Sequence, residues 1–95
     1  NKSGVGLYID TGKSQTVRRL DAVTSTPGFQ AAVYAANTPS GDLGSWTRIA
    51  APRVFSQNTS VTLGRRARSF RYYLLWITKL PPAGRAEIRE LGLSR

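Results

Sequence analysis

The chain has 95 residues, of which 40% are apolar, and a formal net charge of +9, so its size suits one domain. It contains neither cysteine nor histidine, which excludes disulfides, thiolate metal sites and the usual histidine-dependent catalysis. No stretch approaches the roughly 20 apolar residues of a membrane span. Methionine is absent as well, so we expect the chain to be a piece of a longer protein.

The first part of the chain predicts two strands joined by a turn. Apolar and polar side chains alternate over residues 5–9, which is typical of a half-buried strand. Residues 11–14 are predicted to form a turn, and residues 17–23 are apolar enough for a second strand. The adjacent Arg18 and Arg19 break strict alternation, so we expect a bulge or an entry into the sheet at Leu20.

Two further strands are predicted in the middle of the chain. Residues 26–28 are Thr-Pro-Gly, a sequence that suits a type II turn. The strand over residues 29–36 should place Phe29, Ala31, Val33 and Ala35 on one face and Tyr34 on the other. After a loop, a short strand over residues 46–50 is expected to end at Pro52.

The longest apolar run, residues 69–80, predicts the central strand of a sheet. It follows a strand at residues 59–63 and a basic turn at residues 64–69, and Pro81 stops it. Both of its faces are apolar, so we expect both to be covered. On this interpretation its aromatic side chains all belong to the core.

The C-terminal tail could form a short helix over residues 86–91 or a strand. As a strand it needs a bulge near Arg89 and Glu90 to keep Ile88, Leu91 and Leu93 inward. The all-β context favours the strand. Seven short strands then predict one all-β domain over residues 1–95, an antiparallel β-sandwich or jelly roll.

Nearly the whole chain resembles one group of domains. The segments that carry this resemblance are KSGVGLYIDTG, VRRL, TPGFQAAVYAA, SWTRIA, RYYLLWITKLPP and RAEIRELGL, of which Lys2–Gly12 and Arg71–Pro82 are the most specific. They resemble the discoidin-like (galactose-binding-like) jelly rolls of actinobacterial membrane proteins. These proteins include MviN/MurJ-type lipid II flippase homologues that carry a pseudokinase, and related serine/threonine kinases.

The resemblance implies a binding or sensing module outside the cytoplasmic membrane, part of a membrane-anchored parent protein and without enzyme activity or cofactor. The implied partners are a cell-wall glycan such as peptidoglycan, a lipid-linked precursor or another envelope protein. Such domains usually begin with a further segment that holds an acidic loop and a tryptophan. This chain starts after it, so we expect the sandwich to lack its N-terminal segment, and no site from that segment is carried over.

The residues themselves argue against catalysis. The acidic residues are Asp10, Asp21, Asp42, Glu87 and Glu90, and no spacing among them predicts the convergent pair that hydrolysis needs. Ion pairs with arginine explain these acidic residues more simply than catalysis does. The Gly-Lys-Ser at residues 12–14 lacks the earlier glycine and the following helix of a phosphate-binding loop, so we treat it as a chance match.

Two groups of residues are candidates for binding. Trp46, which follows a glycine-rich loop, is a candidate for an exposed ring that contacts a ligand together with Tyr34 and Arg48. The alternative is that Trp46, at the start of a strand, is a lid on the core. The second group is a basic patch that could bind phosphate, carboxylate or an anionic polymer. The alternative is that these arginines are simply solvated side chains around a turn. Its members are Arg65, Arg66, Arg68 and Arg71 at one end of the central strand, with Arg18 and Arg19 as a second pair.

Two other function classes stay open. An interaction or structural domain would use an open sheet edge to pair with another chain. Nucleic-acid binding would need aromatic side chains among the basic ones, whereas the aromatic residues here lie mostly within the apolar strand. The sequence therefore argues against nucleic acid as the partner.

Overall fold

The computed structural model describes residues 5–38, 43–63 and 69–94. These residues form seven strands and one turn of 3-10 helix, so the number of strands agrees with the prediction. The bounds are β1 Val5–Gln15, β2 Arg19–Thr24, β3 Gln30–Ala36, η1 Leu43–Ser45, β4 Thr47–Val54, β5 Asn58–Thr62, β6 Phe70–Lys79 and β7 Ile88–Ser94.

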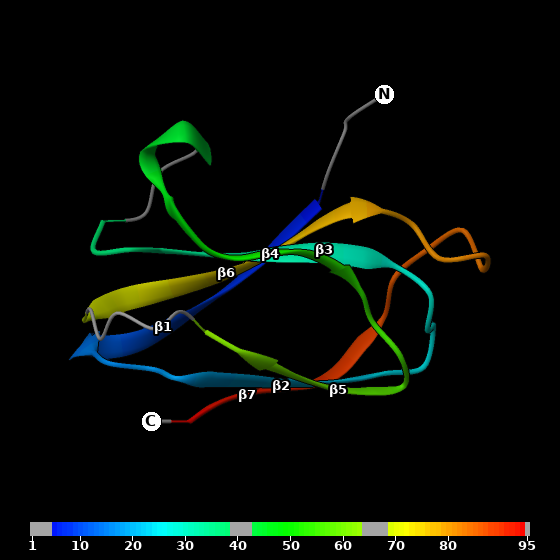
Figure 1. The fold of residues 1–95 in the computed structure, drawn as a ribbon, viewed down its shortest axis with the longest axis horizontal. Helices are drawn as coiled ribbons and strands as arrows, with labels where there is room; N and C mark the ends of the chain where they lie inside the picture. The colour runs from blue at the N-terminus through cyan, green and yellow to red at the C-terminus, as the bar shows by residue number, and fades with distance from the viewer. Residues whose placement is uncertain (1–4, 39–42, 64–68, 95) are drawn as a thin grey trace.

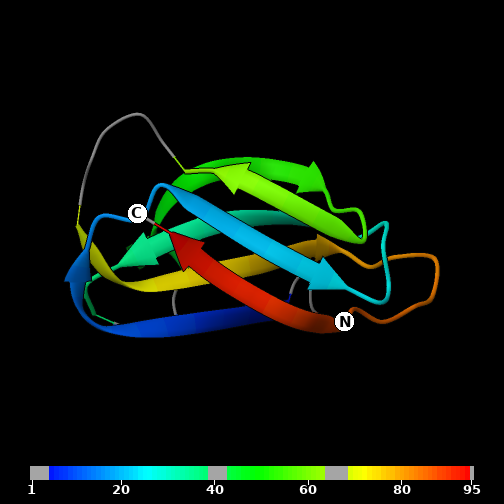
Figure 2. The ribbon, with the colours of Figure 1, turned by 90° about the horizontal axis from the view of Figure 1, so that it is seen from below.

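The strands form two antiparallel sheets that stack as a sandwich (Figures 1 and 2). One sheet has the order β1-β6-β3-β4 and the other has the order β5-β2-β7. Strand β6 lies between β1 and β3, as the prediction of a central strand requires. The all-β antiparallel sandwich predicted from the sequence is confirmed.

The core lies between the two sheets, and strand periodicity decides which side chains enter it. In β3 the inward side chains are Ala31, Val33 and Ala35, with Phe29 just before the strand, while Tyr34 points to the other face. The sequence predicted this division. The other buried members of the core are Val17, Leu20, Ala22, Phe55, Val61, Leu63, Phe70, Tyr73, Leu75 and Ile77.

The tail is a strand, and its bulge is where the alternation required it. Val23 of β2 pairs with Glu90 of β7, whereas Thr24 pairs with Ile88. Arg89 is therefore the extra residue of a β-bulge. Because of this bulge Ile88 packs against the core together with Leu91 and Leu93.

Strand β4 differs from its prediction because it continues through Pro52 to Val54. It is an edge strand, and proline is tolerated at an edge where its missing N–H faces no partner strand. Proline and two register shifts also make this edge irregular, which discourages pairing with another chain.

Strand β1 also differs, since the predicted turn at residues 11–14 lies inside the strand. Asp10 pairs with Tyr72 and Gln15 pairs with Phe70, so the four residues between bulge outward. Gly12 has a φ of 85° there, a conformation that glycine adopts without strain. The next regular element is strand β2 and not a helix, which agrees with a chance match to the phosphate-binding motif.

Tyr73 should contribute to stability through its hydroxyl group. It is 2% exposed, donates a hydrogen bond to the Gln15 carbonyl at 2.7 Å and accepts one from the Val17 N–H at 3.3 Å. Tyr73→Phe should lower the free energy of unfolding by about 1–3 kcal/mol, because the buried Val17 N–H loses its partner. Urea unfolding at pH 7 measures this difference.

The same hydroxyl predicts a pH dependence. Burial raises the pKa of Tyr73 above its ordinary value, so above about pH 10 the unfolded chain loses this proton more readily than the folded one. The free energy of unfolding should therefore fall as the pH rises above about 10. The stability difference between the unmodified protein and Tyr73→Phe should shrink over the same range. An advantage that stays constant between pH 7 and pH 10.5 would contradict this assignment.

Candidate aromatic binding face

The outer face of the four-stranded sheet, which points away from the three-stranded sheet, carries aromatic side chains from three strands. Tyr8 of β1 and Tyr34 of β3 both pair with Leu74 of β6, so the three form a row across the sheet on one face. Tyr72 and Trp76 lie two residues to either side of Leu74 along β6. We call Tyr8, Tyr34, Tyr72 and Trp76 the aromatic face.

The aromatic face is only partly covered. Tyr8 is 52% exposed, and the other three side chains are half-buried. Of the aromatic residues in β6, Phe70 and Tyr73 are in the core as expected. The expectation was wrong for Tyr72 and Trp76, because the second sheet covers only one side of β6.

Trp46 lies on this outer face as well. The turn η1 stands on the outer side of the four-stranded sheet (Figure 1), and the Trp46 N–H donates to the Leu43 carbonyl at 3.0 Å. This turn brings the indole back onto the sheet, where it packs with Ala36 and Leu74. Its ring centroid lies 6.1 Å from that of Tyr8.

The expectation that Trp46 is exposed was therefore wrong, since the side chain is only 8% exposed. Trp46 spans from the β4 side of the sheet to β1 and supports the rings around it. Its predicted contact with a ligand stays a prediction. Its position makes it first of all a packing residue of the outer face.

Gly6 leaves space on strand β1 for the side chains of Leu74 and Trp76. It pairs with Trp76 across the sheet, and a Cβ at this position would lie 2.9 Å from both the Trp76 ring and the Leu74 side chain. Any larger residue would push the indole off the strand. The absence of a side chain at Gly6 therefore leaves room for the Trp76 ring next to β1.

A charged pair borders the aromatic face. The Arg71 Nε and Nη2 groups donate to Asp10 Oδ1 and Oδ2 at 2.7 and 3.0 Å, and the guanidinium carbon lies 5.1 Å from the centre of the Tyr72 ring. The Arg71 hydrogen bonds, followed by one from the Gly12 N–H, hold the pKa of Asp10 below its ordinary value. The pair is thus a fixed carboxylate and guanidinium beside a ring.

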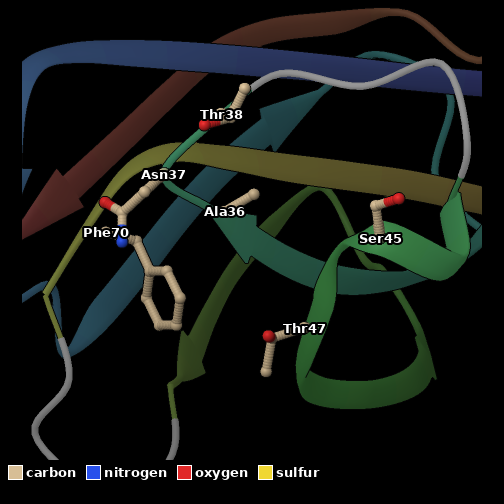
Figure 3. Close-up of a pocket in the computed structure, with 6 residues that line it drawn as sticks. All are labelled: Ala36, Asn37, Thr38, Ser45, Thr47 and Phe70. Atoms are coloured by element: carbon tan, nitrogen blue, oxygen red, sulfur yellow. The ribbon is translucent and has the colours of Figure 1, made fainter.

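A polar pocket of about 430 Å³ adjoins this face at the end of β3. Figure 3 shows Ala36, Asn37 and Thr38 at the end of β3 with the Phe70 ring beside them, and Ser45 on the segment around η1 across from them. Asn37 is held here because its Oδ1 accepts hydrogen bonds from the Ser14 hydroxyl and the Arg71 N–H. The lining residues are Ala36, Asn37, Thr38, Ser45, Thr47 and Phe70.

The other two predicted ligand residues lie at the β4 side of the aromatic face. Tyr34 pairs with Arg48 across β3 and β4, so the two side chains share this face. Arg48 is exposed, and none of the ion pairs found in the described ranges includes it. The structure therefore brings Trp46, Tyr34 and Arg48 to one surface, whereas their contact with a ligand stays a prediction.

The predicted basic patch is not assembled by the described residues. Arg71 belongs to the four-stranded sheet and pairs with Asp10, whereas Arg19 belongs to the three-stranded sheet and pairs with Asp21 at 3.2 Å. Arg18 is exposed next to Arg19. The remaining three members, Arg65, Arg66 and Arg68, lie outside the described residues.

Ion pairs account for three of the acidic side chains that the structure describes. Asp10, Asp21 and Glu87 each pair with an arginine, the last with Arg85 at 2.9 Å. In residues 5–38, 43–63 and 69–94, no three acidic side chains gather to hold a metal ion. Within the same ranges, no helix combines the length and apolar character needed to cross a membrane.

Sequence reasoning missed Tyr8, Tyr72, Trp76 and the Asp10–Arg71 pair as candidates. One signal was available in the sequence, the two-residue period of a strand. Gly6 and Tyr8 are two residues apart in the first strand, and Tyr72 and Trp76 are four apart in the central strand, so the members of each pair share a face. Strict alternation alone, however, would have placed Arg71 on the same face as Tyr73. The bulge in β1 allows it to reach Asp10 instead.

Comparison with solved structures identifies the fold. No protein-family model matches the sequence, and no curated protein does. One similar structure is CpGH89CBM32-6 of Clostridium perfringens, with 13% identity and a TM-score of 0.71. The similarity covers 99% of this chain and 71% of that chain. A GH29 fucosidase of Ruminococcus gnavus in complex with fucose is similar to 99% of this chain, with 16% identity and a TM-score of 0.68.

A mutant of the same fucosidase, also in complex with fucose, gives 16% identity and a TM-score of 0.69. This chain spans only 18% of the length of the fucosidase chains. Identities this low establish the fold and nothing finer. The chain thus has the discoidin-like, galactose-binding-like β-sandwich fold that the sequence resemblance implied.

Proposed function

We propose that this chain is a non-catalytic glycan-binding domain and that the sugar lies on the aromatic face. The observation that carries the proposal is the partly exposed set of Tyr8, Tyr34, Tyr72 and Trp76 on a sheet face that, among the described residues, the three-stranded sheet does not cover. A pyranose presents a C–H face that packs on the electron-rich face of an aromatic ring. Rigid rings also lose little conformational entropy on binding.

Two features around the rings support a sugar over a purely apolar partner. Hydrogen-bonding groups border the face, namely the Asp10–Arg71 pair, the exposed Arg48 and the polar pocket at Asn37. A ligand site of this kind combines aromatic surface with a few polar groups that orient the ligand. The shared fold with a fucosidase chain whose structure contains fucose adds support by analogy.

The finer part of the proposal comes from the sequence resemblance. On that basis the domain lies on the outer side of the cytoplasmic membrane, within a membrane-anchored parent protein. Its ligand would be a cell-wall glycan, either peptidoglycan or a lipid-linked precursor. The support for this context is the resemblance over Lys2–Gly12 and Arg71–Pro82.

Single-stranded nucleic acid is the second candidate, because exposed rings on a sheet also stack bases. The net charge of +9 favours this ligand, whereas the pairing of Arg71 with Asp10 removes one positive charge from the face itself. The two candidates differ in salt dependence. Affinity for nucleic acid falls steeply as salt rises, whereas affinity for a neutral sugar does not.

The test is an NMR titration of the isotope-labelled domain at low and high salt. The probes are methyl α-L-fucopyranoside, soluble peptidoglycan fragments, a panel of neutral and anionic oligosaccharides, and a single-stranded oligonucleotide. We expect saturable, salt-tolerant shifts at Tyr8, Tyr34, Tyr72 and the indole N–H of Trp76. Shifts seen only with anionic probes and removed by salt would contradict the proposal.

Variants make this test specific to the aromatic face. Loss of a stacking ring costs about 1–3 kcal/mol in base-binding proteins, so Tyr8→Ala and Trp76→Ala should lower glycan affinity about 5- to 100-fold. Leu80→Ala is the matched control, because Leu80 is 50% exposed and lies after β6, beyond the aromatic face. Equal affinity in all three variants would place the site elsewhere.

A further inference from the structure

The Asp10–Arg71 pair differs from the other ion pairs of the described residues. Its side chains are 41% and 42% exposed, and it forms two parallel N–H to oxygen hydrogen bonds. Asp10 Oδ1 also accepts the Gly12 N–H at 2.8 Å, and the guanidinium lies over the Tyr72 ring. Arg85 and Glu87, by comparison, share a single hydrogen bond of 2.9 Å.

Stability does not explain why this pair is held so firmly. An exposed ion pair contributes at most about 1 kcal/mol, because water and salt screen it. Here the fork geometry, the backbone N–H and the ring fix both side chains in one orientation. Such preorganised polar groups reduce the entropy cost of binding a ligand.

Both members keep unused hydrogen-bonding capacity. Among the residues that the structure describes, Asp10 Oδ2 accepts only from Arg71 Nη2, which leaves it room for another donor. The Nη1 group of Arg71 makes no hydrogen bond within the described ranges and can donate to an acceptor. An acceptor and a donor therefore stand side by side next to Tyr72, whose ring lies 5.9 Å from that of Tyr8.

We infer that Asp10 and Arg71 bind two adjacent hydroxyls of a neutral sugar whose C–H face packs on the exposed ring of Tyr8, which the Tyr72 ring meets edge-on at an interplanar angle of 77°. This inference rests on the proposed glycan-binding function and names the ligand class, sugars with a vicinal diol. One hydroxyl donates to Asp10 Oδ2, and its neighbour accepts from Arg71. The pair has no net charge, so the site prefers neutral diols to sugar carboxylates or phosphates.

The first experiment compares methyl α-L-fucopyranoside with its 3-O-methyl ether, in which no two free hydroxyls are adjacent. Hydrogen bonds to charged groups contribute about 1.5–3 kcal/mol, so the ether should bind about 10- to 100-fold more weakly. Every glycan that binds in the panel is tested again after periodate oxidation, which cleaves vicinal diols. Oxidation should weaken binding by a similar factor.

Two variants assign the selectivity to this pair. Asp10→Asn keeps the shape but removes the charge, and Arg71→Lys keeps the charge but removes the fork. Each should bind the fucoside about as weakly as the unmodified domain binds the ether, with unchanged affinity for the ether. Arg85→Lys and Glu87→Gln alter an exposed ion pair outside the aromatic face and should keep full selectivity.

The outcomes separate this inference from the proposed function. If glycans bind but neither methylation nor oxidation weakens binding, the inference is wrong and the glycan-binding function stands. If both weaken binding but Asp10→Asn and Arg71→Lys keep the selectivity, the diol is bound by other residues and the assignment fails. If no glycan binds in any form, the proposed function fails, and the inference fails with it.

Discussion

Phe55→Ala is expected to lower the free energy of unfolding by about 3–5 kcal/mol. Phe55 is fully buried and stacks on Phe29, with ring centroids 5.0 Å apart and planes tilted by 20°. The same two residues join their loops through the backbone, since the Phe55 N–H donates to the Phe29 carbonyl at 2.8 Å. The variant leaves a cavity in the buried core, where the close-packed neighbours cannot collapse fully.

Urea unfolding followed by fluorescence measures this loss directly. Val54→Ala is the control, because Val54 is the neighbouring residue and is 63% exposed. A surface substitution of this kind should change stability by less than about 0.5 kcal/mol. A loss below about 2 kcal/mol for Phe55→Ala would show that this stacked pair is not part of a tightly packed core.

Trp46→Ala is expected to have a similar effect, about 3–5 kcal/mol. Although Trp46 lies on the outer face, it is 8% exposed and packs against Ala36, Leu74 and the Tyr8 ring. Its removal takes away a buried member of the apolar cluster on that side of the sheet. Tyr8 should then lose its fixed orientation, so glycan affinity should fall as an indirect result.

The measurement that separates packing from ligand contact compares Trp46→Ala with Trp46→Phe. Phenylalanine fills part of the space, so it should recover part of the lost stability and part of the glycan affinity together. Stability and affinity should therefore change in parallel in these two variants. Full stability combined with lost affinity in Trp46→Ala would instead identify Trp46 as a ligand contact, as the sequence first suggested.

Much of the fold could be predicted because strand patterns are local. Alternation in residues 29–36 correctly assigned Tyr34 to the face opposite Phe29. The need to keep Ile88 and Leu91 both inward correctly predicted the bulge at Arg89. Each of these follows from the two-residue period of a strand and from the requirement to bury apolar side chains.

Other features depend on how the strands are arranged. The strand at Pro52 was predicted to end there, but it continues because β4 is an edge strand. Only the order of strands decides which N–H groups need a partner. The same holds for Arg71, whose side chain reaches Asp10 because a bulge in β1 shifts the register.

By itself the sequence determined that the chain is an antiparallel β-sandwich and, where a strand is regular as in residues 29–36, which side chains share a face. Only the tertiary structure decided which of those faces is covered. The second sheet covers Tyr73 and leaves Tyr72 and Trp76 outside, whereas η1 carries Trp46 back over the outer face. The reason is physical: alternation is a property of one strand, but burial depends on what lies across from it, and distant segments supply that.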